Sequence, residues 1–151
     1  RLRRVVELLA AADVEAVESL DIRRDIWRKL MTNISGNPIA ALTRLAGKDA
    51  VAVSALDEVA IKLIEEALIV AKAQGFDLSA DVSPEGIARP AKGRFPGKPS
   101  MLQDVEAGRA TEVDALVGSI LELGAVAEVA TPAIAAVYGC MRLLEDTRAK
   151  G

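Results

Sequence analysis

A chain of 151 residues with 51% hydrophobic and 27% charged residues is long enough for one domain with a buried core and too apolar to be disordered. Its net charge of -3 does not indicate binding to nucleic acid or to a membrane surface. No apolar run reaches the ~18 residues of a membrane-spanning helix. The absence of histidine excludes the usual zinc sites, Ser-His triads and histidine proton shuttles.

The first stretch of the chain shows a helical pattern and then an alternating one. Apolar residues recur at helical spacing from the start, at Leu2, Val5, Val6 and Leu9. The chain starts inside this pattern and without methionine, so we expect it to be a piece of a longer protein. Residues Asp13–Ser19 then alternate between apolar and polar side chains, which predicts a short edge strand.

A second helix is predicted to begin after Asp21, whose carboxylate can cap the first turn. Its apolar stripe recurs every four residues, at Ile22, Ile26, Leu30 and Ile34. Gly36, and the extended backbone that Pro38 favours at Asn37, predict an interruption or kink. A second short helical pattern follows at residues 38–47.

Three more helices are indicated further along the chain. Ser54 and Asp57 open the strongest helical pattern, which runs to Gly75. Ser83-Pro84-Glu85 is typical of a helix start with proline at the first position, and a basic loop follows at residues 88–100. The last helix starts at Thr131-Pro132 and carries one apolar face, formed by Ile134, Val137, Tyr138, Met141 and Leu144.

The single cysteine, Cys140, lies beside Met141 in this last apolar helix and is predicted to be a buried small hydrophobe. One cysteine cannot form an internal disulfide, which favours a reducing compartment, and no signal-peptide pattern opens the chain. We therefore expect a cytoplasmic protein. Together the patterns predict a mostly α-helical bundle with a short helix and strand at its N-terminus.

Lys29, Asn33 and Asn37 follow one another at four-residue intervals in the second helix. Four residues advance a helix by ~40° beyond a full turn, so Lys29 and Asn33 share a face. A cation beside two amides suits a small substrate with a carbonyl and a carboxylate, because the ammonium can protonate an oxygen that gains negative charge. A solvated surface lysine and two asparagines near a helix end are the alternative.

The stretch from Ser100 to Leu116 also holds several polar residues between helical patterns. Ser100 with Gln103, and Thr111 with Asp114, both have the spacing of a capping box. Glu112 lies in a first helical turn, where the helix dipole favours an acid. Local physical chemistry therefore explains these residues as helix starts, without a ligand.

Two motifs taken together resemble a known family. The pattern W-x-K-x-x-x-N-x-x-x-N-P starts at Trp27, and S-M-x-Q-D-x-x-x-G-R-x-T-E-x-D starts at Ser100. From about Asp21 onward the chain is similar to the C-terminal domain of the ketopantoate reductase (2-dehydropantoate 2-reductase) family. The resemblance implies an NADPH-dependent enzyme that reduces ketopantoate to pantoate for pantothenate and coenzyme A synthesis. It also implies that residues 1–20 end an N-terminal Rossmann domain and that 21–151 form the helical substrate-binding and catalytic domain.

The resemblance also assigns roles to five residues. Lys29 matches the catalytic lysine that protonates the ketone oxygen as hydride arrives, and Asn33 and Asn37 match amides that orient the substrate. Ser100 matches a serine at the substrate's carboxylate end. Glu112 matches an active-site glutamate that contacts ligand hydroxyls, so it is both a catalytic and a cofactor-binding candidate. No metal site is implied.

The cofactor is expected to bind mainly outside this chain. No G-x-G-x-x-G is present to hold the pyrophosphate of NADPH, so the isolated chain is predicted to be inactive. The expected partner is a small 2-oxo acid, and the apolar helices are compatible with a homodimer. The basic loop around Lys92, Arg94 and Lys98 could hold an anion, but a solvated loop is the simpler interpretation.

Two alternatives to this function stay open. The residues after Pro38 lack a further asparagine found in many family members, and Arg44 stands where a small residue is common, so the chain could belong to a related NAD(P)-dependent reductase of another 2-oxo acid. A non-catalytic helical dimerisation or interaction domain is the second alternative, because apolar helix faces can serve a partner as well as a core.

Overall fold

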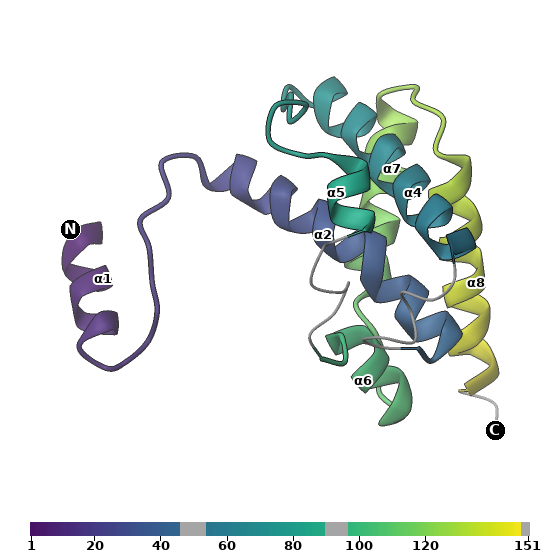
Figure 1. Ribbon diagram of the computed structural model, residues 1–151, viewed down its shortest axis with the longest axis horizontal. Helices are drawn as coiled ribbons and strands as arrows, with labels where there is room; N and C mark the ends of the chain where they lie inside the picture. The colour runs from purple at the N-terminus through teal and green to yellow at the C-terminus, as the bar shows by residue number, and fades with distance from the viewer. Residues whose placement is uncertain (46–53, 90–96, 149–151) are drawn as a thin grey trace.

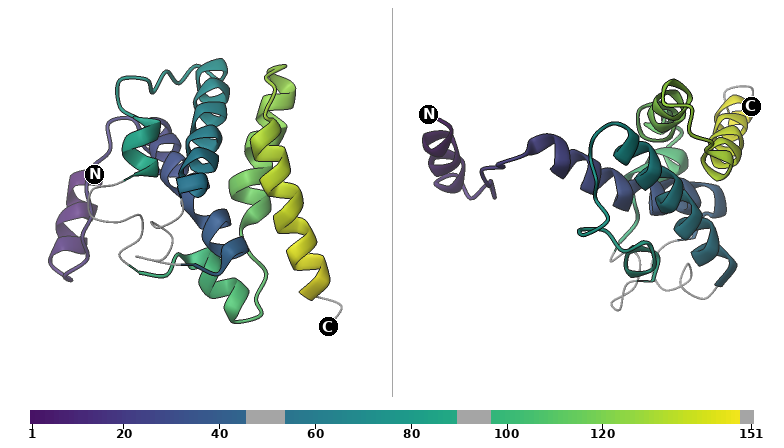
Figure 2. Two further views of the ribbon diagram at one scale, coloured as in Figure 1. Left: turned by 45° about the vertical axis from the view of Figure 1, so that its right-hand side comes forward. Right: turned by 90° about the horizontal axis from the view of Figure 1, so that it is seen from above.

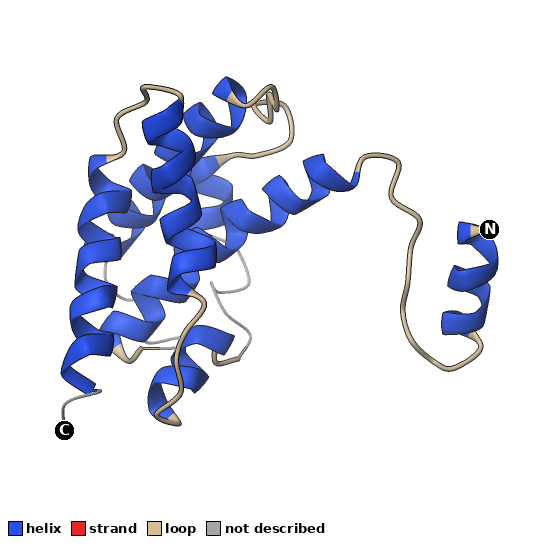
Figure 3. Cartoon of the chain, turned by 180° about the vertical axis from the view of Figure 1, so that it is seen from behind, coloured by secondary structure: helices blue, strands red, loops and turns tan. Residues whose placement is uncertain are grey.

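The computed structural model describes residues 1–45, 54–89 and 97–148, and every regular element within these ranges is a helix (Figures 1 and 3). The helices are α1 (Leu2–Ala10), α2 (Ile22–Thr43), α4 (Ser54–Ala73), α5 (Pro84–Ala88), α6 (Ser100–Glu106), η1 (Asp114–Gly118), α7 (Ser119–Val126) and α8 (Pro132–Arg148). The predicted helical bundle is confirmed. None of the described helices has the length and apolar character needed to cross a membrane.

Helix α2 is the centre of the bundle and packs against α4, α5, α6, η1 and α8. Figure 2 shows α7 and α8 side by side on one side of the bundle, with α4 and α2 beside them. The largest fully buried side chains come from α2, α4, α6, α7, α8 and the turn after α4: Met31, Ile34, Leu63, Ile64, Leu78, Met101, Leu102, Ile120, Ile134 and Met141. Burying one such side chain contributes roughly 1.5–3 kcal/mol, so this shared core holds the helices together.

Helix α2 is continuous through Gly36 and Pro38, so of the predicted interruption or kink only the interruption is absent. Asp21 caps its start as expected, because its carboxylate accepts a hydrogen bond of 3.1 Å from the Arg24 N–H. Pro38 lies inside the helix, where it removes one N–H donor and crowds the preceding turn. The ribbon of α2 changes direction along its length (Figures 1 and 3), which is the usual effect of an internal proline. Packing of the buried residues 34–41 keeps the turns around Pro38 helical.

The first half of α2 is only partly covered by the bundle. Ile22 and Ile26 belong to the predicted apolar stripe, yet 61% and 59% of their surfaces are exposed. Trp27 and Met31 are buried in their place, and the Trp27 ring lies 6.3 Å from that of Phe76 in the turn after α4. The start of α2 extends out of the bundle (Figure 1), and its second apolar side faces η1 and α7 across an open groove. Two isoleucines are therefore left on an open surface.

The N-terminal segment stands apart from the bundle in Figures 1 and 3 and in the right-hand view of Figure 2. Helix α1 has no buried residue, and Val17 and Leu20 in the connection to α2 are 85% and 100% exposed. The strand predicted at Asp13–Ser19 is absent, since these residues have no regular structure. A strand needs a neighbouring backbone to satisfy its hydrogen bonds, and the described residues offer none.

The ends of the later helices follow their local signals. Helix α5 starts as predicted, because the Ser83 hydroxyl accepts a 3.1 Å hydrogen bond from the Gly86 N–H and Pro84 takes the first position. Helix α4 ends just before Gly75, whose φ of +90° favours glycine. Lys92 and Arg94 of the predicted basic loop lie outside the described residues.

Helix α8 presents the predicted face to the core, with Ile134 and Met141 buried. Its first turn is capped from another helix, because the N–H groups of Ala133 and Ile134 each donate a 2.9 Å hydrogen bond to the Glu66 carboxylate of α4. The prediction that Cys140 is buried is wrong, since Cys140 is exposed. One residue turns a helix by ~100°, so the burial of Met141 places its neighbour on the outer side.

Candidate functional site

A groove of about 620 Å³ runs between the first half of α2 and the η1–α7 segment. Its walls are mainly apolar, with four polar side chains among them. The lining residues are Ile22, Asp25, Ile26, Trp27, Lys29, Leu30 and Asn33 from α2, and Ala115, Leu116, Ser119 and Leu123 from η1 and α7. The groove has the size of a small-molecule site and places two of the predicted site residues in one cavity.

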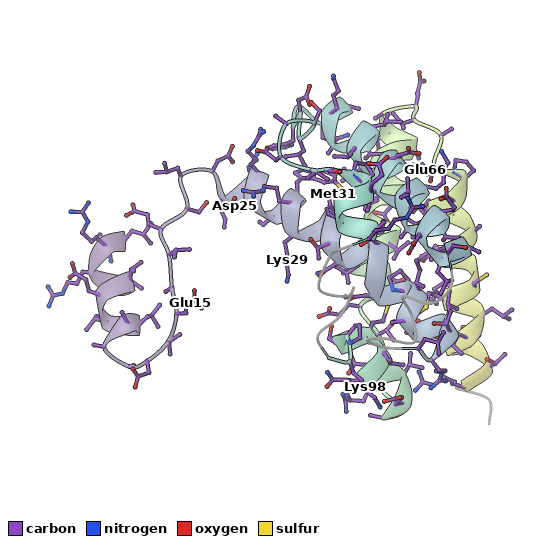
Figure 4. All side chains as sticks on the ribbon, viewed as in Figure 1. Glu15, Asp25, Lys29, Met31, Glu66 and Lys98 are labelled. Carbon is purple, nitrogen blue, oxygen red and sulfur yellow. The ribbon has the colours of Figure 1, made fainter. Side chains whose placement is uncertain are left out.

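Lys29 is exposed, and its side chain projects away from α2 into open space (Figure 4). Within the described part of the chain its ammonium makes no ion pair. Asp25, the other charged residue of the groove, is engaged elsewhere: it accepts a 2.5 Å hydrogen bond from the Ser19 hydroxyl and lies 3.7 Å from Arg28. The Lys29 ammonium is therefore available to an incoming ligand.

Asn37 lies one turn beyond Asn33 and is 8% exposed. Within the described residues no protein group forms a hydrogen bond with its side-chain amide, whereas the neighbouring Ser35 hydroxyl donates to the Thr32 carbonyl oxygen at 2.9 Å. Leaving a buried amide without a partner costs roughly 1–3 kcal/mol, so such a group takes a hydrogen bond from water, an ion or a ligand. Asn37 is not among the groove-lining residues, but it continues their helical run into the bundle.

Ser100 is exposed at the first position of α6, which packs against α2. The predicted capping box is wrong here: the helix is preceded by Pro99 and has no side-chain cap, and the Gln103 amide donates at 2.8 Å to the Lys98 carbonyl oxygen. The Ser100 hydroxyl is therefore not used to start the helix. Lys98 pairs with Glu106 at 2.8 Å, so its charge is already matched.

Glu112 is exposed in the connection between α6 and η1, three residues before the groove residue Ala115. The capping box predicted for Thr111 and Asp114 is wrong. The Thr111 hydroxyl accepts a 3.3 Å hydrogen bond from the Val113 N–H, while the Asp114 carboxylate bonds to side chains of α8. The Glu112 side chain has no hydrogen-bond partner within the described residues, whereas its backbone carbonyl oxygen accepts a 2.9 Å hydrogen bond from the Leu116 N–H.

The wall of the groove opposite Lys29 begins with the π-helical turn η1. Such turns insert one extra residue and are frequent at functional sites. A Cβ atom on Gly118 would lie 3.2 Å from the Tyr138 ring, so glycine allows η1 to approach α8 closely. Sequence patterns did not indicate this turn or its contacts with α8, because the partner residues lie more than twenty positions away.

The described residues contain no group of three or more acidic, cysteine or histidine side chains that could hold a metal ion. They also contain no strand–turn–helix unit of the kind that binds a dinucleotide pyrophosphate. The described residues therefore do not themselves supply the pyrophosphate-binding unit of a dinucleotide site.

Within the described residues, an all-helical domain thus carries an exposed lysine and an asparagine on the wall of one mainly apolar groove. Residues 21–145 match the family model described as the C-terminal domain of the ketopantoate reductase PanE/ApbA. The chain belongs to the ketopantoate reductase family.

Named relatives are similar over almost the whole chain. A 2-dehydropantoate 2-reductase of Mesorhizobium japonicum is 40% identical over 98% of this chain and 45% of its own length. The crystal structure of 2-dehydropantoate 2-reductase from Methylococcus capsulatus matches 100% of this chain and 52% of its own, with a TM-score of 0.87 and 25% identity. D-mandelate dehydrogenase, in a ternary structure with NADH and anilino(oxo)acetate, matches 98% of this chain and 62% of its own, with a TM-score of 0.86 and 22% identity. The chain thus spans about half the length of the curated relatives it matches.

Proposed function

We propose that this chain is the substrate-binding and catalytic domain of an NADPH-dependent 2-dehydropantoate 2-reductase, which reduces ketopantoate to pantoate. The observation that carries the proposal is the run of Lys29, Asn33 and Asn37 along one helix. Among the described residues these are an ammonium without an ion pair beside a groove, an amide in the groove, and a buried amide without a hydrogen-bond partner. Membership of the ketopantoate reductase family supports the substrate.

In this proposal NADPH, held mainly by a Rossmann domain outside this chain, supplies the hydride. Hydride addition to the ketone carbon leaves an alkoxide, and the Lys29 Nζ stabilises this oxygen and donates a proton to it. Asn33 and Asn37 hydrogen-bond the substrate and fix its orientation, and Ser100 binds its carboxylate end. Glu112 accepts hydrogen bonds from ligand hydroxyls, as substrate and cofactor both carry them. No step needs a metal ion.

The proposed division of the chain places residues 1–20 in the Rossmann domain and 21–151 in the helical domain. The support is that α1 and its connection have exposed apolar side chains and no contact with the core, while relatives of twice the length match the chain. An N-terminal domain would cover these side chains. A cytoplasmic location stays a prediction.

The test is the variant Lys29→Ala in the full-length protein, with NADPH oxidation by ketopantoate as the assay. Loss of a general acid that acts in the transition state should lower kcat by ~10²-fold or more. Lys62→Ala is the matched control, because Lys62 is an exposed lysine on α4 whose charge pairs with Glu65 at 2.6 Å. If kcat of Lys29→Ala equals that of the control, the role of Lys29 is wrong.

A second candidate function is the reduction of another 2-oxo acid with NADH or NADPH. The observation that favours it is the apolar groove, which could receive a larger apolar side chain than that of ketopantoate, together with the fold shared with D-mandelate dehydrogenase. Measurement of kcat/KM for a panel of aliphatic and aromatic 2-oxo acids, with each cofactor, separates the two candidates. A higher kcat/KM for an aromatic 2-oxo acid than for ketopantoate would favour the second.

The third candidate is a non-catalytic helical dimerisation domain, favoured only by the exposed apolar residues of α1 and its connection. The protein sequence upstream of Arg1 separates it from the reductases. A strand followed by G-x-G-x-x-G there supports an enzyme, and a sequence without a dinucleotide-binding pattern supports the third candidate. A homodimer is compatible with all three candidates and is measured by light scattering.

A further inference from the structure

Helix α8 presents three polar side chains, Tyr138, Arg142 and Glu145, at helical spacing toward the segment that carries Glu112. All three bond to residues on either side of Glu112. Glu145 binds Thr111, just before it, and Tyr138 and Arg142 bind Asp114, two residues after it. The backbone around Glu112 is thereby held at two points by one rigid element.

The contact before Glu112 is made by a single carboxylate oxygen. Glu145 Oε1 accepts a 2.8 Å hydrogen bond from the Thr111 N–H and a 2.7 Å hydrogen bond from the Thr111 hydroxyl. The Glu145 side chain is only 17% exposed, so these bonds are largely shielded from water. Arg142 lies 3.7 Å from the second oxygen of Glu145 and supports its orientation.

The contact after Glu112 is made by Asp114. Its Oδ1 accepts a 2.8 Å hydrogen bond from the Tyr138 hydroxyl, and its Oδ2 accepts one of 2.9 Å from Arg142. The Asp114 hydrogen bond raises the pKa of Tyr138 above its ordinary value, so the hydroxyl keeps its proton and stays a donor. Gly118 lets the Tyr138 ring lie against η1.

Helix α8 is itself fixed to the bundle. Its first turn is capped by Glu66 of α4, and its buried Ile134 and Met141 lie in the core. A displacement of the α8 backbone that carries Tyr138, Arg142 and Glu145 would therefore disturb the packing of Ile134 and Met141 in the core. The Glu112 side chain has no partner within the described residues, so its position follows from the backbone that the contacts of Thr111 and Asp114 hold.

We propose that Tyr138, Arg142 and Glu145 are positioning residues that place the Glu112 carboxylate for ligand binding in the reductase. This inference rests on the proposed function, because it needs Glu112 to contact a ligand. A carboxylate displaced by about 1 Å can cost up to ~10²-fold in rate, so a remote contact of this kind is measurable in turnover.

The central variants are Glu145→Ala and Glu145→Gln in the full-length protein, with kcat and KM for ketopantoate reduction as the readout. Glu145→Ala removes both bonds to Thr111 and should lower kcat/KM about tenfold. Glu145→Gln keeps an Oε1 oxygen that can accept both bonds, so kcat/KM should stay within about twofold of the parent value. Glu65→Ala is the control, because it removes a carboxylate from α4 whose partner is the exposed Lys62.

A double-mutant cycle with Glu112→Gln distinguishes positioning from general stability. If Glu145 acts through Glu112, Glu145→Ala should cause little further loss in the Glu112→Gln background. The inference is overturned if Glu145→Ala lowers kcat/KM equally in the parent and Glu112→Gln backgrounds, or if Glu145→Ala and Glu145→Gln have equal activity. Either result leaves the role of Glu112 intact. A Glu112→Gln variant with parental activity overturns the role of Glu112 in the proposed function, and the inference with it.

Circular dichroism and thermal unfolding establish whether each variant folds. If Glu145→Ala does not fold, Tyr138→Phe replaces it, because it keeps the ring against Gly118 and removes only the hydroxyl bond to Asp114. Tyr138→Phe should lower kcat/KM by several-fold in the parent and leave it unchanged in the Glu112→Gln background. An unchanged kcat/KM in the parent background overturns the inference.

Discussion

Asp77 holds the turn after α4 through three interactions of one carboxylate. It accepts hydrogen bonds from the Ser79 hydroxyl at 2.7 Å and the Ser79 N–H at 3.0 Å, and it lies 3.0 Å from the Lys72 ammonium. The Ser79 hydroxyl bond, followed by the Ser79 N–H bond and the Lys72 hydrogen bond, holds the pKa of Asp77 well below its usual value of 3.8. The folded turn therefore favours the charged carboxylate.

We predict that this preference makes part of the stability depend on pH. Because the pKa is lower in the folded than in the unfolded chain, the stabilisation is complete above pH 3.8 and is lost as the pH falls below that value. The difference in Tm between the parent and Asp77→Asn should be positive at pH 6 and should shrink as the pH falls from 4 to 2.5. Thermal unfolding followed by circular dichroism measures it.

Ser79→Ala provides the internal check on this prediction, since it removes the donor of the strongest interaction. The pH-dependent difference should be smaller when both proteins carry Ser79→Ala. A parent and an Asp77→Asn variant with the same Tm at pH 6 would show that the carboxylate does not stabilise the turn.

Single residues also show where sequence patterns are sufficient and where they are not. Asp21 and Ser83 cap their helices as predicted, because a cap depends on the next three residues only. Cys140 was expected to be buried, yet it is exposed, because the packing of α8 against its neighbouring helices determines which face of α8 is covered. The burial of the Asn37 amide depends on the packing of the whole bundle, and spacing alone could not reveal it.

At the scale of elements, the start of α8 depends on a residue of another helix. The Glu66 carboxylate of α4 accepts two backbone N–H bonds from the first turn of α8, and it lies at the positive end of the helix dipole. These two bonds join α4 to α8 across 67 and 68 residues of sequence. No local pattern predicts such a cap.

We predict that Glu66→Ala lowers the free energy of unfolding by about 1–2 kcal/mol, because it leaves two partly buried N–H groups without a partner. Urea denaturation of the chain measures this change. Its matched control is Glu65→Ala, one position earlier, which removes only an exposed ion pair with Lys62 and should cost less than ~0.5 kcal/mol. Equal losses in the two variants would show that the cap contributes nothing beyond a surface charge.

Helix α1 is an element that its own sequence cannot stabilise. It has nine residues and none is buried, and isolated helices shorter than ~12–15 residues are marginal in water. We predict that its backbone amides exchange with solvent within seconds in the isolated chain, while the amides of α2 and α4 stay protected. Hydrogen exchange read by mass spectrometry tests this, and protection of α1 in the full-length protein is expected if a Rossmann domain covers it. Strong protection of α1 in the isolated chain would contradict the prediction.

At the scale of the whole molecule, the helical class was predictable because most helices carry their own apolar period and caps. The prediction of a strand at Asp13–Ser19 was wrong, because a strand needs a neighbouring strand and the described residues contain none. The candidate site was predictable in part: spacing placed Lys29 and Asn33 on one face, and both line the groove. The roles of Ser100 and Glu112 came only from the family resemblance, since helix-start chemistry explained them equally well.

The last prediction concerns what the chain can do alone. A reductase needs a hydride donor beside the carbonyl, and the described residues, which are helical throughout their regular structure, lack the strand–turn–helix unit that cradles a dinucleotide pyrophosphate. The isolated chain should therefore not oxidise NADPH in the presence of ketopantoate. This should hold even at protein concentrations about 100-fold above those at which the full-length protein gives a clear rate. Loss of absorbance at the nicotinamide band of NADPH measures the reaction.

The control for this experiment is the fold of the isolated chain, measured by helical circular dichroism and a cooperative unfolding transition. A folded chain without turnover supports a site completed by a second domain, because Lys29, Asn33 and Asn37 are all present and only the cofactor side is missing. Turnover by the folded chain, abolished by Lys29→Ala, would instead mean that the groove between α2 and η1–α7 binds the cofactor as well as the substrate. The groove walls would then have to bind the hydride donor, and this result would contradict the proposed division into a cofactor-binding and a substrate-binding domain.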